Sequence, residues 1–337
     1  MMLTEKYRPK IPEDLILNKS QKSQIDKIIK SKFSHNLIIT GPSGTGKTST
    51  AHCISRVLLG PYYNKGGGML EFNASDERGI KTVQESIAYF CKMKLSIKSD
   101  HKEIYANHKI VLLDEADKLT KKAQQLINKI IDENSGRVIF IFTCNESSEI
   151  IEAIQSRSSI IKYELLSSYQ VKKKLLYICE KENIIFDNSG IDSIVYISDG
   201  DLRKAIHNLQ VIHKSYNLVN ENNVFKLCEK PHPEKIKRLI YLCFKKNLKN
   251  ALICSKKLFD EGHLPTDICL SMVNFLKKYD DSPLDLKKTS EDYDDFSKYY
   301  DKNVYIFLEE LCSSLLIMNQ GLDTNIQFYG CVAKWCK

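Results

Sequence analysis

Long apolar runs are missing from this 337-residue sequence. No stretch approaches the ~20 consecutive apolar residues that a membrane-spanning helix needs. The first residues, Met-Met-Leu-Thr-Glu-Lys, lack the apolar core of a secretory signal peptide. We therefore expect neither a membrane segment nor a cleaved leader.

Closely paired cysteines are also missing. The eleven cysteines are scattered between Cys53 and Cys336, and none forms a C-x-x-C pair. This spacing argues against the common zinc and dithiol motifs, and the odd number argues against a disulfide framework. We expect reduced, mostly buried thiols, as in cytosolic or nuclear proteins.

No internal repeat of fixed period is found, and the charge is only moderately unbalanced. Lys and Arg number 50 against 42 Asp and Glu, which leaves a formal charge of +8. Such an excess suits a polyanionic partner without requiring one, so the positions of the charges must decide. The chain length predicts two or three domains.

The strongest local pattern is a glycine-rich segment between an apolar run and a helix-compatible run. Residues 37–50 read Leu-Ile-Ile-Thr-Gly-Pro-Ser-Gly-Thr-Gly-Lys-Thr-Ser-Thr, which contains the phosphate-binding pattern G-x-x-x-x-G-K-[ST]. Glycines let backbone N–H groups approach phosphate oxygens, and the following helix N-terminus attracts the same anion. We predict that Lys47 bridges the β- and γ-phosphates of ATP and that Thr48 binds Mg²⁺. The predicted nucleotide loop comprises Gly41, Pro42, Ser43, Gly44, Thr45, Gly46, Lys47, Thr48 and Ser49.

Apolar runs alternate with helical patterns over the first half of the chain. The expected strands cover 37–40, 69–72, 109–113, 137–143 and 160–163, and near-continuous apolar strands predict a parallel sheet covered on both faces. The prolines in residues 1–18 predict an extended lead-in. Beyond residue 167 only helical patterns remain, at 169–183, 187–198, 201–215, 220–228 and through 234–336, with an acidic break near 280–295.

Polar residues follow two of the expected strands. Asp114 and Glu115 end the strand at 109–113, at the sheet edge where ligands bind in open α/β folds. We predict that Asp114 holds Mg²⁺, directly or through water, and that Glu115 is the general base for the attacking water. Asn145 ends the next strand and is predicted to orient that water. The alternative for Asn145 is a cap on the short helix that follows.

Arg203 lies in the first turns of an expected helix that Asp199 or Asp201 can cap. A cation at that end opposes the helix dipole, which makes sense if an anion is its partner. We predict a contact with the γ-phosphate, and the alternative is a surface salt bridge.

Two further expected helices open with basic pairs. Arg78 and Lys81 begin one, and Lys121 and Lys122 begin the other, after Thr120 as the predicted cap. These four cations reinforce the positive ends of their helices, so we predict that they bind DNA phosphates without reading sequence. The alternative is that they are solvated surface charges.

Arg157, in Gln155-Ser156-Arg157-Ser158, should point away from the P-loop of its own chain. It is therefore a candidate arginine finger for the nucleotide of a neighbouring subunit.

Six segments taken together resemble one family. They look like the sequence boxes of the small subunits of replication factor C, the eukaryotic sliding-clamp loader, and the likeness extends from residue 3 to about 240. Within that family, residues 228–233 are similar to the second subunit. The segments are 4–10, 41–48, 71–80, 112–117, 154–157 and 200–205.

This resemblance implies an AAA+ ATPase with a P-loop α/β domain at 1–166, a helical lid at 167–229 and a helical collar at 230–337. It implies ATP and Mg²⁺ as cofactors, a nuclear hetero-pentamer of replication factor C subunits, and the clamp PCNA and primer–template DNA as partners. By position, Thr4, Arg8 and Ile16 would line the adenine side of the pocket.

Two other functions stay open from the sequence. The chain could be a structural subunit that holds ATP but hydrolyses little of it, although Glu115 and Asn145 argue against this. It could also be another AAA+ DNA-processing loader or a Holliday-junction motor, against which residues 73–80 count.

Overall fold

The computed structural model describes residues 2–31, 35–63, 67–74, 80–93, 105–228, 230–279, 296–321 and 324–337. They form two compact units. The first consists of Met1–Val171 with Gly200–Ile206, and the second of Lys172–Asp199 with His207–Lys337. Among the described residues, no helix combines the length and the apolar character that crossing a bilayer requires.

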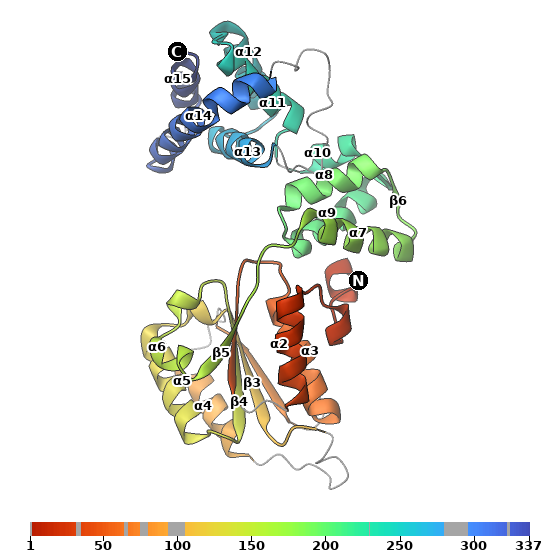
Figure 1. The fold of residues 1–337 in the computed structure, drawn as a ribbon, viewed down its shortest axis with the longest axis vertical. Coiled ribbons are helices and arrows are strands. Elements are labelled where there is room, and N and C mark those ends of the chain that lie inside the picture. The colour runs from red at the N-terminus through yellow and green to blue at the C-terminus, as the bar shows by residue number, and fades with distance from the viewer. Residues whose placement is uncertain are drawn as a thin grey trace. The chain divides into compact units, whose positions relative to one another are not determined.

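The first unit contains a five-stranded, all-parallel sheet with the order β2-β3-β4-β1-β5 (Figure 1). The predicted α/β class and parallel sheet are confirmed. The strands are β1 (Asn36–Thr40), β2 (Met69–Asn73), β3 (Lys109–Asp114), β4 (Val138–Cys144) and β5 (Ser158–Lys162).

Helices cover both faces of this sheet, α2 and α3 on one side and α4 and α5 on the other (Figure 1). The larger helices are α2 (Lys19–Lys30), α3 (Lys47–Leu59), α4 (Ile80–Lys92) and α5 (Lys121–Glu133). Shorter elements are α1 (Leu3–Lys6), α6 (Glu152–Gln155) and the 3₁₀ turns η1 (Pro12–Asp14), η2 (Gly60–Tyr62), η4 (Ala116–Lys118) and η5 (Ser147–Glu149).

The lead-in differs from the extended segment that the prolines predicted. Leu3–Lys6 forms one helical turn, because the carbonyl of Met2 accepts hydrogen bonds from the backbone N–H groups of Glu5 and Lys6. Pro12 stands at the first position of η1, where a missing N–H group has no cost. Ile11 before η1, and Leu15 and Asn18 after it, are extended as predicted.

Strand residues alternate between the two cores because successive side chains point to opposite faces. In β1, Leu37 and Ile39 pack with α2 and α3, whereas Ile38 packs with α4 and α5. In β3, Ile110 and Leu112 face the first core in the same way. The strands are buried on both faces, which explains their near-continuous apolar sequence.

One buried polar side chain fixes the segment that leads to β5. Gln124 of α5 is 1% exposed. Its Nε2 donates to the carbonyls of Leu119 and Glu149, at 3.2 and 3.0 Å, and its Oε1 accepts from the backbone N–H of Ile151 at 2.8 Å. A single amide thus makes three hydrogen bonds to backbone groups that belong to no helix or strand ladder.

The second unit is helical apart from two short paired strands, β6 (Ile185–Phe186) and β7 (Leu218–Val219), which the sequence did not predict. Its helices begin and end close to the expected boundaries. They are α7 (Ser168–Glu182), α8 (Asn188–Ser198), α9 (Leu202–Tyr216), α10 (Glu221–Leu227), α11 (Pro233–Phe244), α12 (Leu248–Asp260), α13 (Pro265–Lys278), α14 (Phe296–Asn319) and α15 (Asn325–Trp335). The first residues of α7 and α9 belong to the first unit.

Helices α11 to α15 share one apolar core of their own. It is built only from residues between Ile236 and Cys336, with Phe275, Phe296 and Phe328 fully buried at its centre. All eleven cysteines are free thiols and eight of them are buried, as the sequence predicted.

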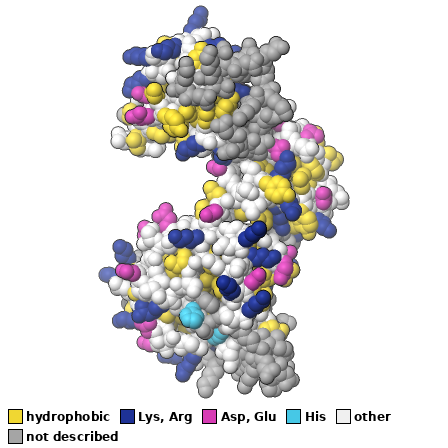
Figure 2. Space-filling view, in the orientation of Figure 1, with side chains coloured by type: hydrophobic (Ala, Val, Ile, Leu, Met, Phe, Trp, Pro, Cys, Tyr) yellow, Lys and Arg dark blue, Asp and Glu magenta, His cyan; other side chains and the backbone are white. Residues whose placement is uncertain are grey.

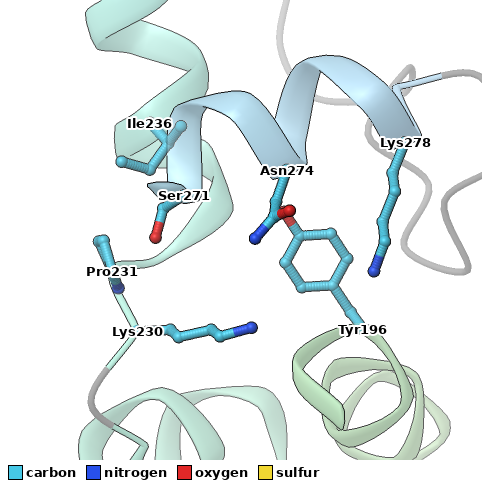
Figure 3. Close-up of a pocket in the computed structure, with 7 residues that line it drawn as sticks. All are labelled: Tyr196, Lys230, Pro231, Ile236, Ser271, Asn274 and Lys278. Carbon is cyan, nitrogen blue, oxygen red and sulfur yellow. The ribbon is translucent and has the colours of Figure 1, made fainter. Parts of the chain in front are cut away.

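A small hollow lies between α8, the start of α11 and the C-terminal half of α13 (Figure 3). Lys278 forms an ion pair with Asp199 at 2.5 Å, and Lys230 donates to the carbonyl of Ile197 at 3.2 Å. The hollow has room for about one water molecule, so it is a packing defect between helices and not a ligand pocket.

We expect Gln124→Met to destabilise the first unit by about 1–3 kcal/mol, because it keeps the volume but removes three partly buried hydrogen bonds to the backbone. Urea denaturation followed by circular dichroism measures this loss, and hydrogen exchange should show faster exchange of the Ile151 amide. Gln125→Met is the matched control, because Gln125 is exposed on the same helix and should change stability by less than about 0.5 kcal/mol. Equal losses in both variants would contradict this role of Gln124.

Candidate nucleotide site

The predicted P-loop connects the carboxyl end of β1 to the start of α3. Gly46 stands in the left-handed region at φ 97° and is the N-cap of α3, and Thr45 donates to the carbonyl of Pro42 at 2.8 Å. Lys47, Thr48 and Ser49 form the first turn of α3. The loop therefore presents a helix N-terminus, which attracts anions, at the sheet edge where ligands bind.

Two glycines of the loop are required by close approaches. Gly41, at φ 148°, lies against the backbone of Tyr163, and a Cβ there would overlap its carbonyl oxygen. Gly44, at φ 68°, lies against Asp201, and a Cβ there would overlap the carboxylate. The loop is thus enclosed by the end of β5 on one side and by the start of α9 on the other.

Lys47 is a partly buried cation without a carboxylate partner among the described residues. Its Nζ donates to the carbonyls of Gly41 and Pro42, at 2.7 and 2.8 Å, and to Asn145 Oδ1 at 3.0 Å. Burial lowers the pKa of Lys47, and the positive charge of Arg203 acts in the same direction. A cation held only by neutral acceptors fits the phosphates of a nucleotide, which would supply the missing negative charge.

Thr48 and Asp114 meet beside Lys47. Asp114 Oδ1 accepts from the hydroxyl of Thr48 at 2.9 Å and also from the hydroxyl of Thr143. The other oxygen of Asp114 accepts no hydrogen bond from the described residues. Because Mg²⁺ is usually held by one or two side-chain oxygens together with phosphates, this pair fits the predicted metal site.

Glu115 follows Asp114 in a left-handed conformation at φ 55°, which is rare for a residue with a side chain. Its backbone N–H donates to Thr143 Oγ1 at 3.2 Å, and its carboxylate forms an ion pair with Lys118 at 2.5 Å. The hydrogen bond that Lys118 donates to Glu115 raises the pKa of Lys118. This ion pair is solvent-exposed.

Asn145 lies with Lys47, where the sequence placed it. Its side-chain oxygen accepts from Lys47, and its backbone N–H donates to Asp117 Oδ2 at 3.0 Å. The alternative of a capping asparagine is not realised, because the N-cap of η5 is Glu146. Asp117 therefore sets the position of the residue that contacts the P-loop lysine.

The start of α9, which belongs to the first unit, closes the site. Asp201 caps α9 by accepting from the Lys204 backbone N–H at 2.9 Å, and its other oxygen accepts from Ser43 at 3.1 Å. The Leu202 N–H donates to the Gly44 carbonyl at 3.3 Å. Arg203, in the first turn, is exposed and close enough to influence the pKa of Lys47. Of the two predicted caps, Asp201 is the one used, and Asp199 is the C-cap of α8.

The residues expected on the adenine side lie in the lead-in. Thr4 is in α1, Arg8 pairs with Glu5 at 3.5 Å, and Ile16 follows η1 and is half-buried. The lead-in contacts α3, because the carbonyl of Pro9 accepts from the Cys53 thiol at 3.5 Å.

Arg157 lies at the opposite edge of the sheet from the P-loop. It immediately precedes β5, whose first residue pairs with Asn36 at the start of β1, whereas the P-loop follows the end of β1. Its guanidinium forms an ion pair with Asp132 at 3.0 Å and donates to the carbonyl of Ala153 at 2.8 Å. Arg157 is therefore separate from the nucleotide site of its own chain.

Of the four predicted DNA-binding residues, two have described side chains. Lys121 and Lys122 are exposed in the first turn of α5, with Thr120 as the cap that the sequence predicted. Arg78 lies outside the described residues, as does the side chain of Lys81. On the face shown in Figure 2, lysines and arginines are scattered among neutral and acidic side chains.

Three residues of the site were missed from the sequence. The hydroxyl of Thr143 donates to Asp114 and accepts from the backbone of Glu115. Asp117 accepts from the backbone of Asn145, and Lys118 forms an ion pair with Glu115. Thr143 could have been found, because it is a polar residue near the end of a buried strand. The contacts of Asp117 and Lys118 depend on the turn that follows β3, which the sequence pattern does not specify.

We expect Gly44→Ala to weaken ATP binding tenfold or more, equivalent to about 1.4 kcal/mol or more, because its Cβ would displace Asp201 and the start of α9. Gly136→Ala is the control, since Gly136 is also at positive φ but has open space around it. Both variants should lose about 1–2 kcal/mol of stability from the backbone strain. Fluorescent-nucleotide titration measures the loss of ATP affinity separately from the loss of stability. Equal ATP affinity in both variants would contradict a role for the close approach of Gly44 to Asp201.

Comparison with known proteins gives the family. Residues 37–165 match the model of the AAA family, the ATPase family associated with various cellular activities. The probable replication factor C subunit 2 of Dictyostelium discoideum is 35% identical over 98% of this chain and 91% of its own length. Replication factor C subunit 4 of Saccharomyces cerevisiae is 38% identical over 78% of this chain and 79% of its own.

Among solved structures, the Holliday junction branch migration motor RuvB of Thermotoga maritima is similar, with a TM-score of 0.52 over 70% of this chain and 78% of its own. At 15% identity this likeness concerns the fold alone. Some relatives are named subunit 2 and others subunit 4. The comparisons therefore do not distinguish the predicted likeness to the second subunit from a likeness to the fourth. The identity and coverage of the sequence matches show that the chain belongs to the replication factor C family of small subunits, which are AAA ATPases.

Proposed function

We propose that this chain is the ATP-binding and ATP-hydrolysing subunit of a replication factor C complex that opens the sliding clamp PCNA and loads it onto primer–template DNA. The observation that carries the proposal is Lys47, a partly buried cation whose acceptors are all neutral, beside Asp114, Thr48 and Asn145. Family membership supplies the context in which such a site works.

Each group of the site has a defined task in this proposal. Lys47 and the loop N–H groups bind the phosphates, and Thr48 and Asp114 hold Mg²⁺, which would neutralise phosphate oxygens when bound. Glu115 accepts the proton of the attacking water, for which it must leave Lys118. Asn145 orients that water and Arg203 contacts the γ-phosphate. Thr4, Arg8 and Ile16 contact the adenine side.

The proposed site is incomplete without a neighbouring subunit. Because Arg157 lies at the other edge of its own sheet, it acts on the ATP of an adjacent subunit, and another subunit supplies the corresponding arginine here. Hydrolysis by the isolated chain should therefore be slow, and assembly into the hetero-pentamer in the nucleus should raise it.

We also propose the division of the chain into a nucleotide domain at 1–166, a lid at 167–229 and a collar at 230–337. The separate apolar core of residues 236–336 supports the collar. The contact of Asp201 with Ser43 supports a lid that follows the state of the P-loop.

Glu115→Gln should leave ATP affinity within about twofold of wild type and lower hydrolysis at this site by about 10²–10⁴-fold, because the amide cannot accept the proton. The measurement is ATP turnover and clamp loading by the assembled complex, with this substitution in this chain alone. Unchanged turnover would favour the alternative in which the chain holds ATP for structural purposes. Loss of ATP binding would show instead that the site itself was damaged.

Lys121→Glu combined with Lys122→Glu should weaken DNA binding uniformly across sequences. The slope of log affinity against log salt should fall by about 0.9 for each phosphate contact that is lost. Lys129→Glu is the control, because Lys129 is exposed on the same helix but far from its N-terminus. Arg78→Glu with Lys81→Glu should act in the same way. An unaltered slope in both double variants would exclude these contacts.

A further inference from the structure

Arg157 is anchored through its side chain although it is exposed at the surface. Its Nε lies 3.0 Å from Asp132 Oδ1, at the end of α5, and one terminal nitrogen donates to the carbonyl of Ala153 in α6 at 2.8 Å. A guanidinium has five N–H donors. One N–H thus donates to Ala153 and Nε lies in the ion pair with Asp132, whereas the other N–H groups have no acceptor among the described residues.

The backbone of Arg157 is anchored as well. Asn36, the first residue of β1, donates from Nδ2 to the carbonyl of Arg157 at 3.4 Å. The Oδ1 atom of Asn36 accepts from the backbone N–H of Phe140 in β4 at 3.0 Å. The position of Arg157 is therefore tied to two neighbouring strands of the sheet, and its side chain contacts α5 and α6.

These anchors have a physical consequence for any anion that meets the arginine. An unrestrained arginine loses about 2 kcal/mol of side-chain entropy when it is fixed in one orientation. Because Nε and the terminal nitrogens lie in one plane, a contact at Nε and a second contact at a terminal nitrogen together fix the orientation of the guanidinium before a ligand arrives. The side chains of Arg157 and Asp132 are 46% and 50% exposed, so their ion pair contributes at most about 1 kcal/mol to stability.

We propose that Asp132 is a positioning residue for Arg157, which holds the free N–H donors ready for the nucleotide bound by the neighbouring subunit. This inference rests on the proposed function, because it needs Arg157 to act across a subunit junction. Asp132 itself touches neither the nucleotide nor the reacting atoms.

A different role for the same pair predicts the opposite result. If Asp132 only offset the charge of Arg157, its removal would strengthen the positive field at the neighbour's phosphates and raise hydrolysis. If Asp132 positions Arg157, its removal lets the guanidinium move, and an error of about 1 Å costs up to about 10²-fold in rate.

The test uses the complex assembled with its partner subunits, with Glu115→Gln in this chain so that its own site is silent. Four substitutions are added singly to this chain: Asp132→Ala, Asp132→Asn, Glu133→Ala and Arg157→Ala. The rate and the KM for ATP are measured, together with assembly by gel filtration. The part of the rate that is lost in Arg157→Ala defines the hydrolysis that depends on the arginine.

We expect Asp132→Ala to lower the arginine-dependent hydrolysis about tenfold or more with little change in KM. Asp132→Asn should recover most of it, because the amide oxygen keeps a polar contact with Nε. Glu133→Ala is the matched control, since it removes the same charge from the next exposed residue of α5, and it should behave as wild type.

The outcomes distinguish failure of the proposed action of Arg157 on a neighbouring nucleotide from failure of its positioning by Asp132. If Arg157→Ala leaves hydrolysis unchanged, the trans-acting role of the arginine is wrong and the role of Asp132 is wrong with it. If Arg157→Ala lowers hydrolysis but Asp132→Ala equals or exceeds the wild-type rate, only the positioning role is overturned. An Asp132→Asn variant as slow as Asp132→Ala would overturn it as well.

Discussion

The nucleotide site depends on a lysine whose hydrogen-bond acceptors are all neutral. Lys47 is half-buried, and all three acceptors around it are oxygens from the P-loop and from Asn145. Burial lowers the pKa of Lys47, although the nearby carboxylates of Asp114 and Asp117 act in the opposite direction. The loop therefore favours a bound anion. The residues that contact Lys47 are those whose contacts change when an anion binds.

The parallel sheet separates the two halves of the proposed reaction. The carboxyl ends of β1, β3 and β4 deliver the P-loop, Asp114 and Asn145 to one edge, whereas Arg157 precedes β5 at the other edge. A chain built in this way cannot bring its own Arg157 to its own P-loop without breaking the sheet. The proposed dependence on a neighbour therefore rests on strand direction, which is a property of the fold and not of one contact.

Much of this could be predicted from the sequence because it is encoded locally. The P-loop, the Asp114–Glu115 pair and Asn145 each follow a buried strand, and parallel strands place such residues at one edge. The helix boundaries beyond residue 167 were also close, since apolar spacing at helical period is a strong signal. The lead-in was misjudged, because Pro12 is tolerated in the first turn of a helix.

The residues that the sequence did not reveal act through contacts distant in the chain. Asp117 meets the backbone of Asn145, Gln124 meets Ile151, and Asp132 meets Arg157, each across 25 or more positions. Nothing in local composition distinguishes these polar residues from solvated neighbours such as Gln125 or Glu133. They become identifiable only when the packing of α5 against the following segments is known.

Glu115 illustrates how a weak contact can matter for a reaction. Its backbone is in the left-handed region and donates to Thr143, and its carboxylate forms an exposed ion pair with Lys118. Exposed pairs of this kind contribute at most about 1 kcal/mol. The backbone is therefore fixed through Thr143, whereas breaking the ion pair with Lys118 costs little free energy. This combination suits the proposed role of general base, which requires a fixed backbone and a carboxylate that can turn toward a water.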